Sequence, residues 1–364
     1  MDLPVGLASI NDYAFCGSGL ESVYINSGLY HLGTGVFANC RSLSDVRFAY
    51  NISLSGIPAE TFYHCNISNI IFPYDIGFIG ASAFSGCPLE EINLNRIEYI
   101  EEGAFTGNMV SAIHIPSCVR EIGANAIMGQ NLYEITVDSA NTAYTAENNV
   151  LYTKDMTHIL QCATILDYST YIMPESVTTA DPAAFYGNES LTYAELSSSL
   201  TELSENMFSY AQRLRNVKIN NGTVNIGAAA FYGCTDLKRI TMPQSMKKIS
   251  ASAFSNCYRL SLAEFNEGLE SIGSSAFSRC EIKKAELPES LKYLGRSVFS
   301  DCELELIVIK SDIEPLVNEA EEEYGWEYGK PFDSLYSVDY IELTEGVTQF
   351  NAEWFYASIN ESFR

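Results

Sequence analysis

Basic residues are scarce in this sequence, where 21 Lys and Arg stand against 46 Asp and Glu and give a formal net charge of −25. A nucleic-acid partner is therefore not expected, because phosphate binding needs a basic surface. The scarcity is uneven, and we expect a strongly acidic N-terminal half. Only five basic residues precede position 213, namely Arg41, Arg47, Arg96, Arg120 and Lys154.

Long apolar runs are also missing. No stretch approaches the roughly 18 apolar residues of a membrane-spanning helix, so membrane insertion is not expected in this segment. The start, Met1-Asp2-Leu3-Pro4-Val5, lacks the basic residues and apolar stretch of a secretory signal. The chain is therefore either not exported or a mature or excised segment. Hydrophobic residues make up 47% of it, which excludes a disordered chain.

Signatures of catalysis are absent as well. The sequence contains no phosphate loop, no G-x-S-x-G elbow and no H-E-x-x-H motif. None of the four histidines belongs to a nucleophile or metal motif, and we interpret them as surface or hydrogen-bonded residues. They are His31, His64, His114 and His158. The sequence therefore predicts a protein that is not an enzyme and holds no cofactor.

What the sequence does contain is a repeat built around an Ala-Phe dipeptide. The dipeptide is often preceded by Ile-Gly, and an aliphatic residue six positions after the Phe opens a short alternating stretch, which indicates a half-buried strand. The dipeptides begin at Ala14, Ala83, Ala104, Ala184, Ala230, Ala253 and Ala276. We expect the Gly to permit a tight corner and the Pro after many strands to end strand pairing.

The spacing of these predicted strands is regular. Eleven of the thirteen gaps between successive strand openings lie between 21 and 24 residues. The openings are Leu20, Leu43, Ile67, Leu89, Val110, Leu132, Tyr168, Leu191, Leu214, Leu237, Leu260, Ile282, Leu304 and Val338. One turn of about 22 residues cannot bury its own apolar side, so successive turns must stack and share a continuous core.

The pattern I-G-x-x-A-F-x-x-C-x-x-L-x-x-I-x-I/M-P resembles the BspA-like leucine-rich repeat family. It is clear in Ile249 to Cys257 and in Leu237 to Pro243, and the resemblance extends from Leu7 to Phe355. The fold expected is an α/β, mostly β, solenoid: a curved leucine-rich repeat superhelix with about fourteen short parallel strands on one face. The resemblance further implies a bacterial surface or secreted protein associated with adhesion.

We expect a single solenoid over residues 1–364 with two insertions. A β-hairpin is predicted near 138–167, where Asn149–Tyr152 and Thr157–Leu160 flank a polar turn. An acidic insertion is predicted near 310–337, with a short helix over Glu314–Glu323. Each is interpreted either as a solvated spacer or as a binding element. Both ends of the chain break within a repeat, so we expect it to be a segment of a longer protein.

Seven of the ten cysteines share one slot, three residues after the repeat Phe: Cys40, Cys65, Cys87, Cys234, Cys257, Cys280 and Cys302. Asn108, Asn188 and Gln130 occupy the slot in other turns, which indicates a buried ladder that caps backbone groups near the corner. Free structural thiols are favoured. The alternatives are disulfides between turns or a metal site, although no Cys-x-x-Cys or Cys-x-x-His spacing occurs.

A cluster of basic residues marks the candidate binding site. Seven of the 21 lie in three adjacent predicted turns, Arg213, Arg215, Lys218, Lys238, Arg239, Lys247 and Lys248, and the last six of these are our candidate partner-binding residues. They form either a positive patch for an acidic protein or glycan surface or an ordinary solvated face with acidic neighbours.

The function expected is a non-catalytic protein-interaction or adhesion module, with a protein or a host or bacterial surface ligand as partner. Two alternatives stay open: a glycan-binding module of a cell-envelope protein, and an intracellular scaffold. The resemblance places the chain at the cell surface or outside the cell, while a cytoplasmic location is the alternative that the thiols permit.

Overall fold

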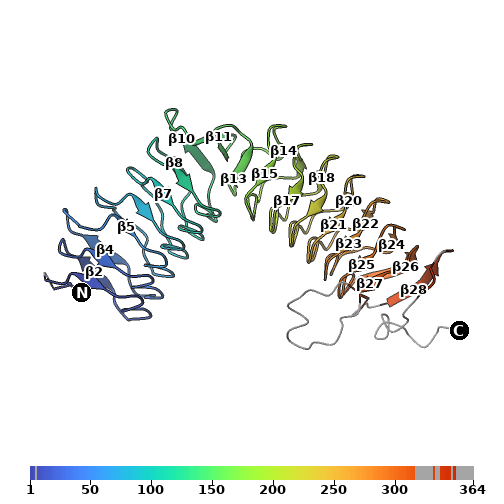
Figure 1. The fold of residues 1–364 in the computed structure, drawn as a ribbon, viewed down its shortest axis with the longest axis horizontal. Helices are drawn as coiled ribbons and strands as arrows, with labels where there is room; N and C mark the ends of the chain where they lie inside the picture. The colour runs from blue at the N-terminus through green and yellow to red at the C-terminus, as the bar shows by residue number, and fades with distance from the viewer. Residues whose placement is uncertain (5, 316–330, 333–336, 346, 350–364) are drawn as a thin grey trace. The chain divides into compact units, whose positions relative to one another are not determined.

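A computed structural model describes residues 1–4, 6–315, 331–332, 337–345 and 347–349. Contacts divide the chain into two compact units, Met1–Ile165 and Leu166–Arg364. Within each unit, successive turns of the chain stack on one another (Figure 1). The parts described contain strands and turns but no helix, so the α component of the expected α/β class is absent from them. Glu314–Pro315 form strand β27, and the rest of the predicted acidic helix lies outside the described residues.

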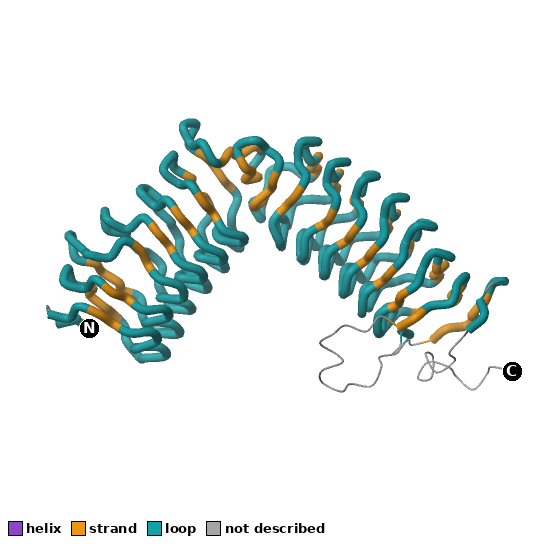
Figure 2. Tube along the Cα trace, in the orientation of Figure 1, coloured by secondary structure: helices purple, strands orange, loops and turns teal. Residues whose placement is uncertain are grey.

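In the first unit, the strands, orange in Figure 2, are of two kinds: longer strands, and two-residue strands that pair in separate sheets. The longer strands form what we call the strand face: β2 (Ser22–Ile25), β4 (Asp45–Phe48), β8 (Ala112–Ile115) and β10 (Glu134–Val137). The short-strand face consists of β1 (Ser9–Ile10), β3 (His31–Leu32), β5 (Gly56–Ile57), β6 (Phe78–Ile79), β7 (Tyr99–Ile100) and β9 (Glu121–Ile122).

The second unit repeats this arrangement. Its strand face consists of β14 (Thr170–Ile172), β16 (Tyr193–Glu195), β18 (Asn216–Lys218), β20 (Arg239–Thr241), β22 (Leu262–Glu264), β24 (Lys284–Leu287), β26 (Glu303–Ile309) and β28 (Ser337–Leu343). Its short-strand face consists of β15 (Thr179–Ala180), β17 (Glu202–Leu203), β19 (Asn225–Ile226), β21 (Lys248–Ile249), β23 (Ser271–Ile272), β25 (Tyr293–Leu294) and β27.

The predicted parallel stacking is confirmed. Neighbouring strands of a face pair in parallel one repeat apart, as β16 does with β18 through Ala194 and Val217. Twelve of the fourteen predicted strands are present, and no strand forms at the two predicted openings Ile67 and Leu89. The short-strand face was not predicted as a sheet, although β17, β19, β21, β23, β25 and β27 form a continuous one.

The core of each unit is a stack of the repeat phenylalanines. In the second unit, the rings of Phe208, Phe231, Phe254 and Phe277 lie 5.1 to 5.5 Å apart and within 8° of parallel. All four side chains are fully buried. The residues two before and two after each such Phe adopt a left-handed backbone, for example Ser252 (φ 54°) and Asn256 (φ 62°). These paired reversals make the compact corner.

The glycine after the repeat Ile has a different role from the one expected. Gly273 and Gly295 are not among the left-handed corner residues. A Cβ at Gly273 would lie 2.5 Å from the backbone nitrogen of Ala251 in the preceding turn, and one at Gly295 would lie 2.3 Å from that of Ser274. Glycine is therefore favoured here because two backbones approach closely.

The cysteine ladder caps backbone carbonyls, as predicted. Each of its seven thiols donates a hydrogen bond of 3.0 to 3.2 Å to the carbonyl oxygen of the Phe in the preceding turn. All ten cysteines are free, and burial raises the pKa of Cys87 and of Cys302 to about 12. These two thiols therefore stay protonated at neutral pH and can act as donors. Gln130 is exposed and does not join the ladder.

The long interval after β10 contains three antiparallel strands. β11 (Tyr144–Glu147) pairs with β12 (Val150–Thr153), and β12 pairs with β13 (His158–Cys162). Most of their residues are buried, including Leu151, Tyr152 and Ile159. The segment therefore contributes to the core of the first unit, which a solvated spacer would not do.

Candidate interaction surface

The six candidate basic residues are all exposed, but they do not form one patch. Lys218 and Arg239 point outward from β18 and β20 on the strand face, whose inward neighbours Val217 and Ile240 are buried. Arg215 and Lys238 immediately precede these two strands. Lys247 and Lys248 lie at β21, which belongs to the short-strand face. The cluster predicted from sequence is thus divided between two faces of the second unit.

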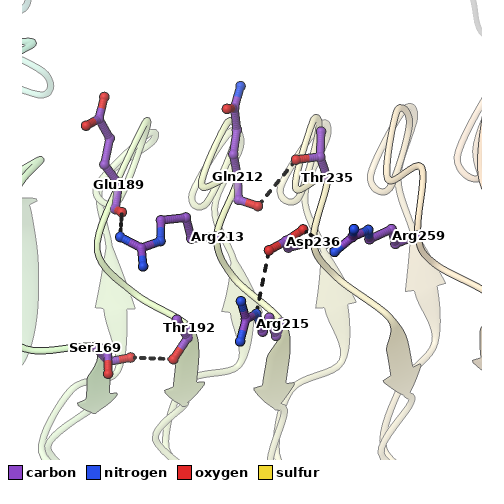
Figure 3. A network of polar contacts seen from close by, with 9 residues as sticks. All are labelled: Ser169, Glu189, Thr192, Gln212, Arg213, Arg215, Thr235, Asp236 and Arg259. Carbon is purple, nitrogen blue, oxygen red and sulfur yellow. Dashed lines mark hydrogen bonds and ion pairs between the residues drawn. The ribbon is translucent and has the colours of Figure 1, made fainter.

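Several of these cations form ion pairs between turns. The guanidinium of Arg215 lies 3.5 Å from the carboxylate of Asp236, which also accepts a 2.8 Å hydrogen bond from Arg259 (Figure 3). Arg213 donates a long hydrogen bond of 3.5 Å to the carbonyl oxygen of Glu189. Arg213 and Arg215 precede β18, Asp236 precedes β20 and Arg259 precedes β22. These polar contacts therefore run from turn to turn along the stack.

Lys218 is paired most closely. Its ammonium donates a 2.7 Å hydrogen bond to Glu195, one turn earlier on β16. This bond raises the pKa of Lys218 and lowers that of Glu195. On the short-strand face, Lys247 lies 3.3 Å from Glu270, which also binds Lys292 at 3.1 Å. These cations are largely neutralised by carboxylates in adjacent turns.

Three candidates keep their charge unpaired. Within residues 1–4 and 6–315, no carboxylate forms an ion pair with Lys238, Arg239 or Lys248. Arg239 also borders a shallow groove of about 330 Å³ between β18 and β20. Other residues that line it are Asn216, Lys218, Asn220 and Thr241. On the strand face, Lys238 and Arg239 are therefore the two candidate residues whose charge is not compensated by a carboxylate.

A second groove, in the first unit, was not predicted. It has a volume of about 670 Å³ and lies between β4 and residues 68–74, where the strand expected after Ile67 is absent. Tyr50, Ile71 and Tyr74 border it with exposed fractions of 91%, 80% and 65%. Such a concentration of exposed large side chains is typical of an interaction site.

A signal for this groove was present in the sequence. Tyr50, Tyr74 and Arg96 each lie seven residues after a predicted strand opening, in three successive turns. This slot lies beyond the short alternating stretch from which each strand is predicted. In the structure, the guanidinium carbon of Arg96 lies 3.2 Å from the centre of the Tyr74 ring, a cation–π contact.

The described part of the chain offers neither a metal site nor a membrane-spanning helix. Among the described residues, no group of three His, Cys, Asp or Glu side chains is arranged to hold a metal ion. No helix in the described part of the chain has the length and apolar character needed to cross a membrane. His114 is exposed on its strand, as expected, and forms a 3.0 Å hydrogen bond with Thr136.

Comparison with protein families gives one match, to the model described as BspA type Leucine rich repeat region. It matches in six copies over residues 1–56, 55–172, 178–305 and 247–320, which together cover most of the chain. No curated protein matches the chain significantly.

Three solved bacterial structures are similar. A leucine rich cell surface protein from Faecalibacterium prausnitzii is 28% identical, with a TM-score of 0.59 over 72% of this chain and 86% of its own. The pneumococcal vaccine antigen PcpA is 17% identical, with a TM-score of 0.63 over 94% and 88%. A leucine-rich repeat protein from Eubacterium ventriosum is 22% identical, with a TM-score of 0.53 over 80% and 79%. The last two likenesses concern the fold alone.

Proposed function

Because the chain belongs to the BspA-type leucine-rich repeat family, we propose that it is a non-catalytic protein-binding module that mediates adhesion at a bacterial cell surface. Proteins built from leucine-rich repeats generally bind other proteins and are generally not enzymes. Surface display is supported by the relative from Faecalibacterium prausnitzii, which is described as a cell surface protein.

The observation that carries this proposal is a pair of adjacent cations without carboxylate partners, Lys238 and Arg239, of which Arg239 borders the groove between β18 and β20. Most other cations of the strand face are neutralised across turns, so an approaching partner meets a local positive field on an acidic protein of net charge −25. Such a field favours an acidic protein surface through charge complementarity. Cations that are already paired with carboxylates attract a partner less strongly, because the neighbouring carboxylate compensates their charge.

The test is the attachment of beads that carry the purified chain to bacterial or host cells. Cells treated with protease should lose attachment, whereas cells whose glycans have been oxidised with periodate should keep it. Beads that carry serum albumin control for non-specific adhesion. Attachment that survives protease and is lost after periodate would contradict a protein partner and favour the glycan-binding alternative.

A further inference from the structure

Strand β4 has an open hydrogen-bonding edge. The backbone N–H groups of Asp45 and Ala49 donate to the preceding turn, at Glu21 and Ile25. In a parallel sheet, alternate residues bond to opposite neighbours, so the N–H and C=O groups of Val46 and Phe48 point toward the following turn. In the described part of the chain, no main-chain or side-chain group pairs with them.

This open edge lies in the groove of about 670 Å³, whose wall includes Val46, Phe48 and Phe72. At the slot of Phe48 and Phe72, the aliphatic residues Ile25 and Leu94 of neighbouring turns are almost fully buried, whereas both phenylalanines are partly exposed. The groove therefore reaches the apolar core. It offers four backbone hydrogen-bonding groups next to apolar surface, which are the features that an added β-strand needs.

The rim supplies side-chain contacts of a defined kind. Tyr50 and Tyr74 border the groove from two successive turns, and the guanidinium of Arg96, in the next turn, lies over the Tyr74 ring. Arg47 is engaged by two hydrogen bonds of 2.9 and 2.6 Å to Asp45, so its charge is compensated. The first unit has sixteen Asp and Glu against five Lys and Arg. Its field therefore favours a cationic ligand.

We propose that the groove between β4 and residues 68–74 binds an extended, basic segment of a partner protein, which adds a strand to the free edge of β4. The proposal rests on the proposed function and specifies one mode of protein recognition for it. Because β4 has four residues, an added strand of about four residues would cover its length. Its alternate side chains would face the core and the solvent, so alternating apolar and basic residues fit best.

The probe is a seven-residue peptide that alternates lysine and valine, blocked at both ends and added to the full chain at about 1 mM, a concentration that reveals weak affinity. Hydrogen exchange measured by mass spectrometry should show new protection over residues 44–50. Two peptides serve as controls: one with glutamate in place of lysine, and one with alternate backbone nitrogens methylated on the edge that faces β4. We expect each to bind at least about tenfold more weakly.

Matched protein variants locate the site. Tyr50→Ala and Tyr74→Ala should each weaken peptide binding about fivefold, whereas Tyr133→Ala, which removes a half-exposed tyrosine outside the groove, should leave it unchanged. The proposal is overturned if the lysine–valine peptide gives no protection at residues 44–50, or if the methylated peptide binds equally well. If the peptide does not bind but the beads still attach to cells in a protease-sensitive way, the groove is rejected as a binding site and the proposed function stands.

Discussion

The thiol of Cys257 donates a 3.1 Å hydrogen bond to the carbonyl oxygen of Phe231, which lies 26 residues earlier in the preceding turn. The same contact recurs wherever Cys occupies this slot, so each such turn satisfies a backbone acceptor at the corner of the one before it. The carbonyl oxygen of Phe231 also accepts a 3.1 Å hydrogen bond from the backbone N–H of Cys234, so the thiol adds a second hydrogen bond, which contributes about 0.5 to 1.5 kcal/mol. This contribution requires a protonated thiol, because a thiolate has no hydrogen to donate.

This requirement predicts a pH dependence. Burial raises the pKa of Cys87 to about 12, above the value of roughly 8.5 for an exposed thiol. The unfolded chain therefore loses this proton first, and the stability that depends on it is present at neutral pH and falls as pH rises from about 8.5 toward 12. We expect the difference in free energy of unfolding between the wild type and Cys87→Ala to shrink from about pH 8 to 10. Urea denaturation of both proteins in the presence of reductant, repeated at each pH, measures this difference. A difference that does not change with pH would contradict the role of the protonated thiol.

Removal of one ring from the phenylalanine stack should be costly. Phe254 lies 5.1 Å from both Phe231 and Phe277, so Phe254→Ala removes two ring contacts and leaves a cavity. We expect a loss of about 3 to 5 kcal/mol in the free energy of unfolding of the second unit. Tyr258→Ala, which truncates an exposed ring four residues away, should change it by less than about 0.5 kcal/mol. Equal effects of the two substitutions in urea denaturation would contradict the stacked core.

The close approach of turns at glycine gives a third prediction. A methyl group at Gly273 would overlap the backbone at Ser250 and Ala251, so Gly273→Ala should lower the free energy of unfolding by about 1 to 3 kcal/mol. Gly19→Ala is the matched control, because a Cβ at Gly19 meets nothing within 4 Å. Thermal unfolding followed by circular dichroism distinguishes them. A Gly273→Ala protein as stable as the wild type would show that the turns are spaced more widely.

The fold was predictable because its main determinants recur at a fixed interval. The spacing of the Phe, Cys and strand residues indicates stacking directly, since only equivalent positions in successive turns can meet. The short-strand face escaped prediction because each of its strands, such as Lys248–Ile249, has only two residues and no visible alternation. The missing strand after Ile67 could not be foreseen either, because that segment keeps the apolar pattern of its neighbours.

The candidate surface was predictable only in part. Composition identified the cluster of Arg and Lys, but a linear count could not show that Lys218 and Lys248 belong to different faces. Pairing at repeat-length separations offered a usable signal, since Lys218 and Glu195 are 23 residues apart. The open edge of β4 depends on an absent pairing of Val46 and Phe48, which no residue pattern records.

Charge reversal at Lys238 and Arg239 tests most directly the central claim that the chain acts through a protein-binding surface on its strand face. Both cations lack carboxylate partners in the described structure, so the double variant Lys238→Glu and Arg239→Glu leaves every ion pair described above intact. We predict that beads carrying it attach to target cells at least about tenfold less well than wild type, while Lys248→Glu on the other face attaches normally. Undiminished attachment of the double variant, with its fold verified by circular dichroism, would contradict the claim.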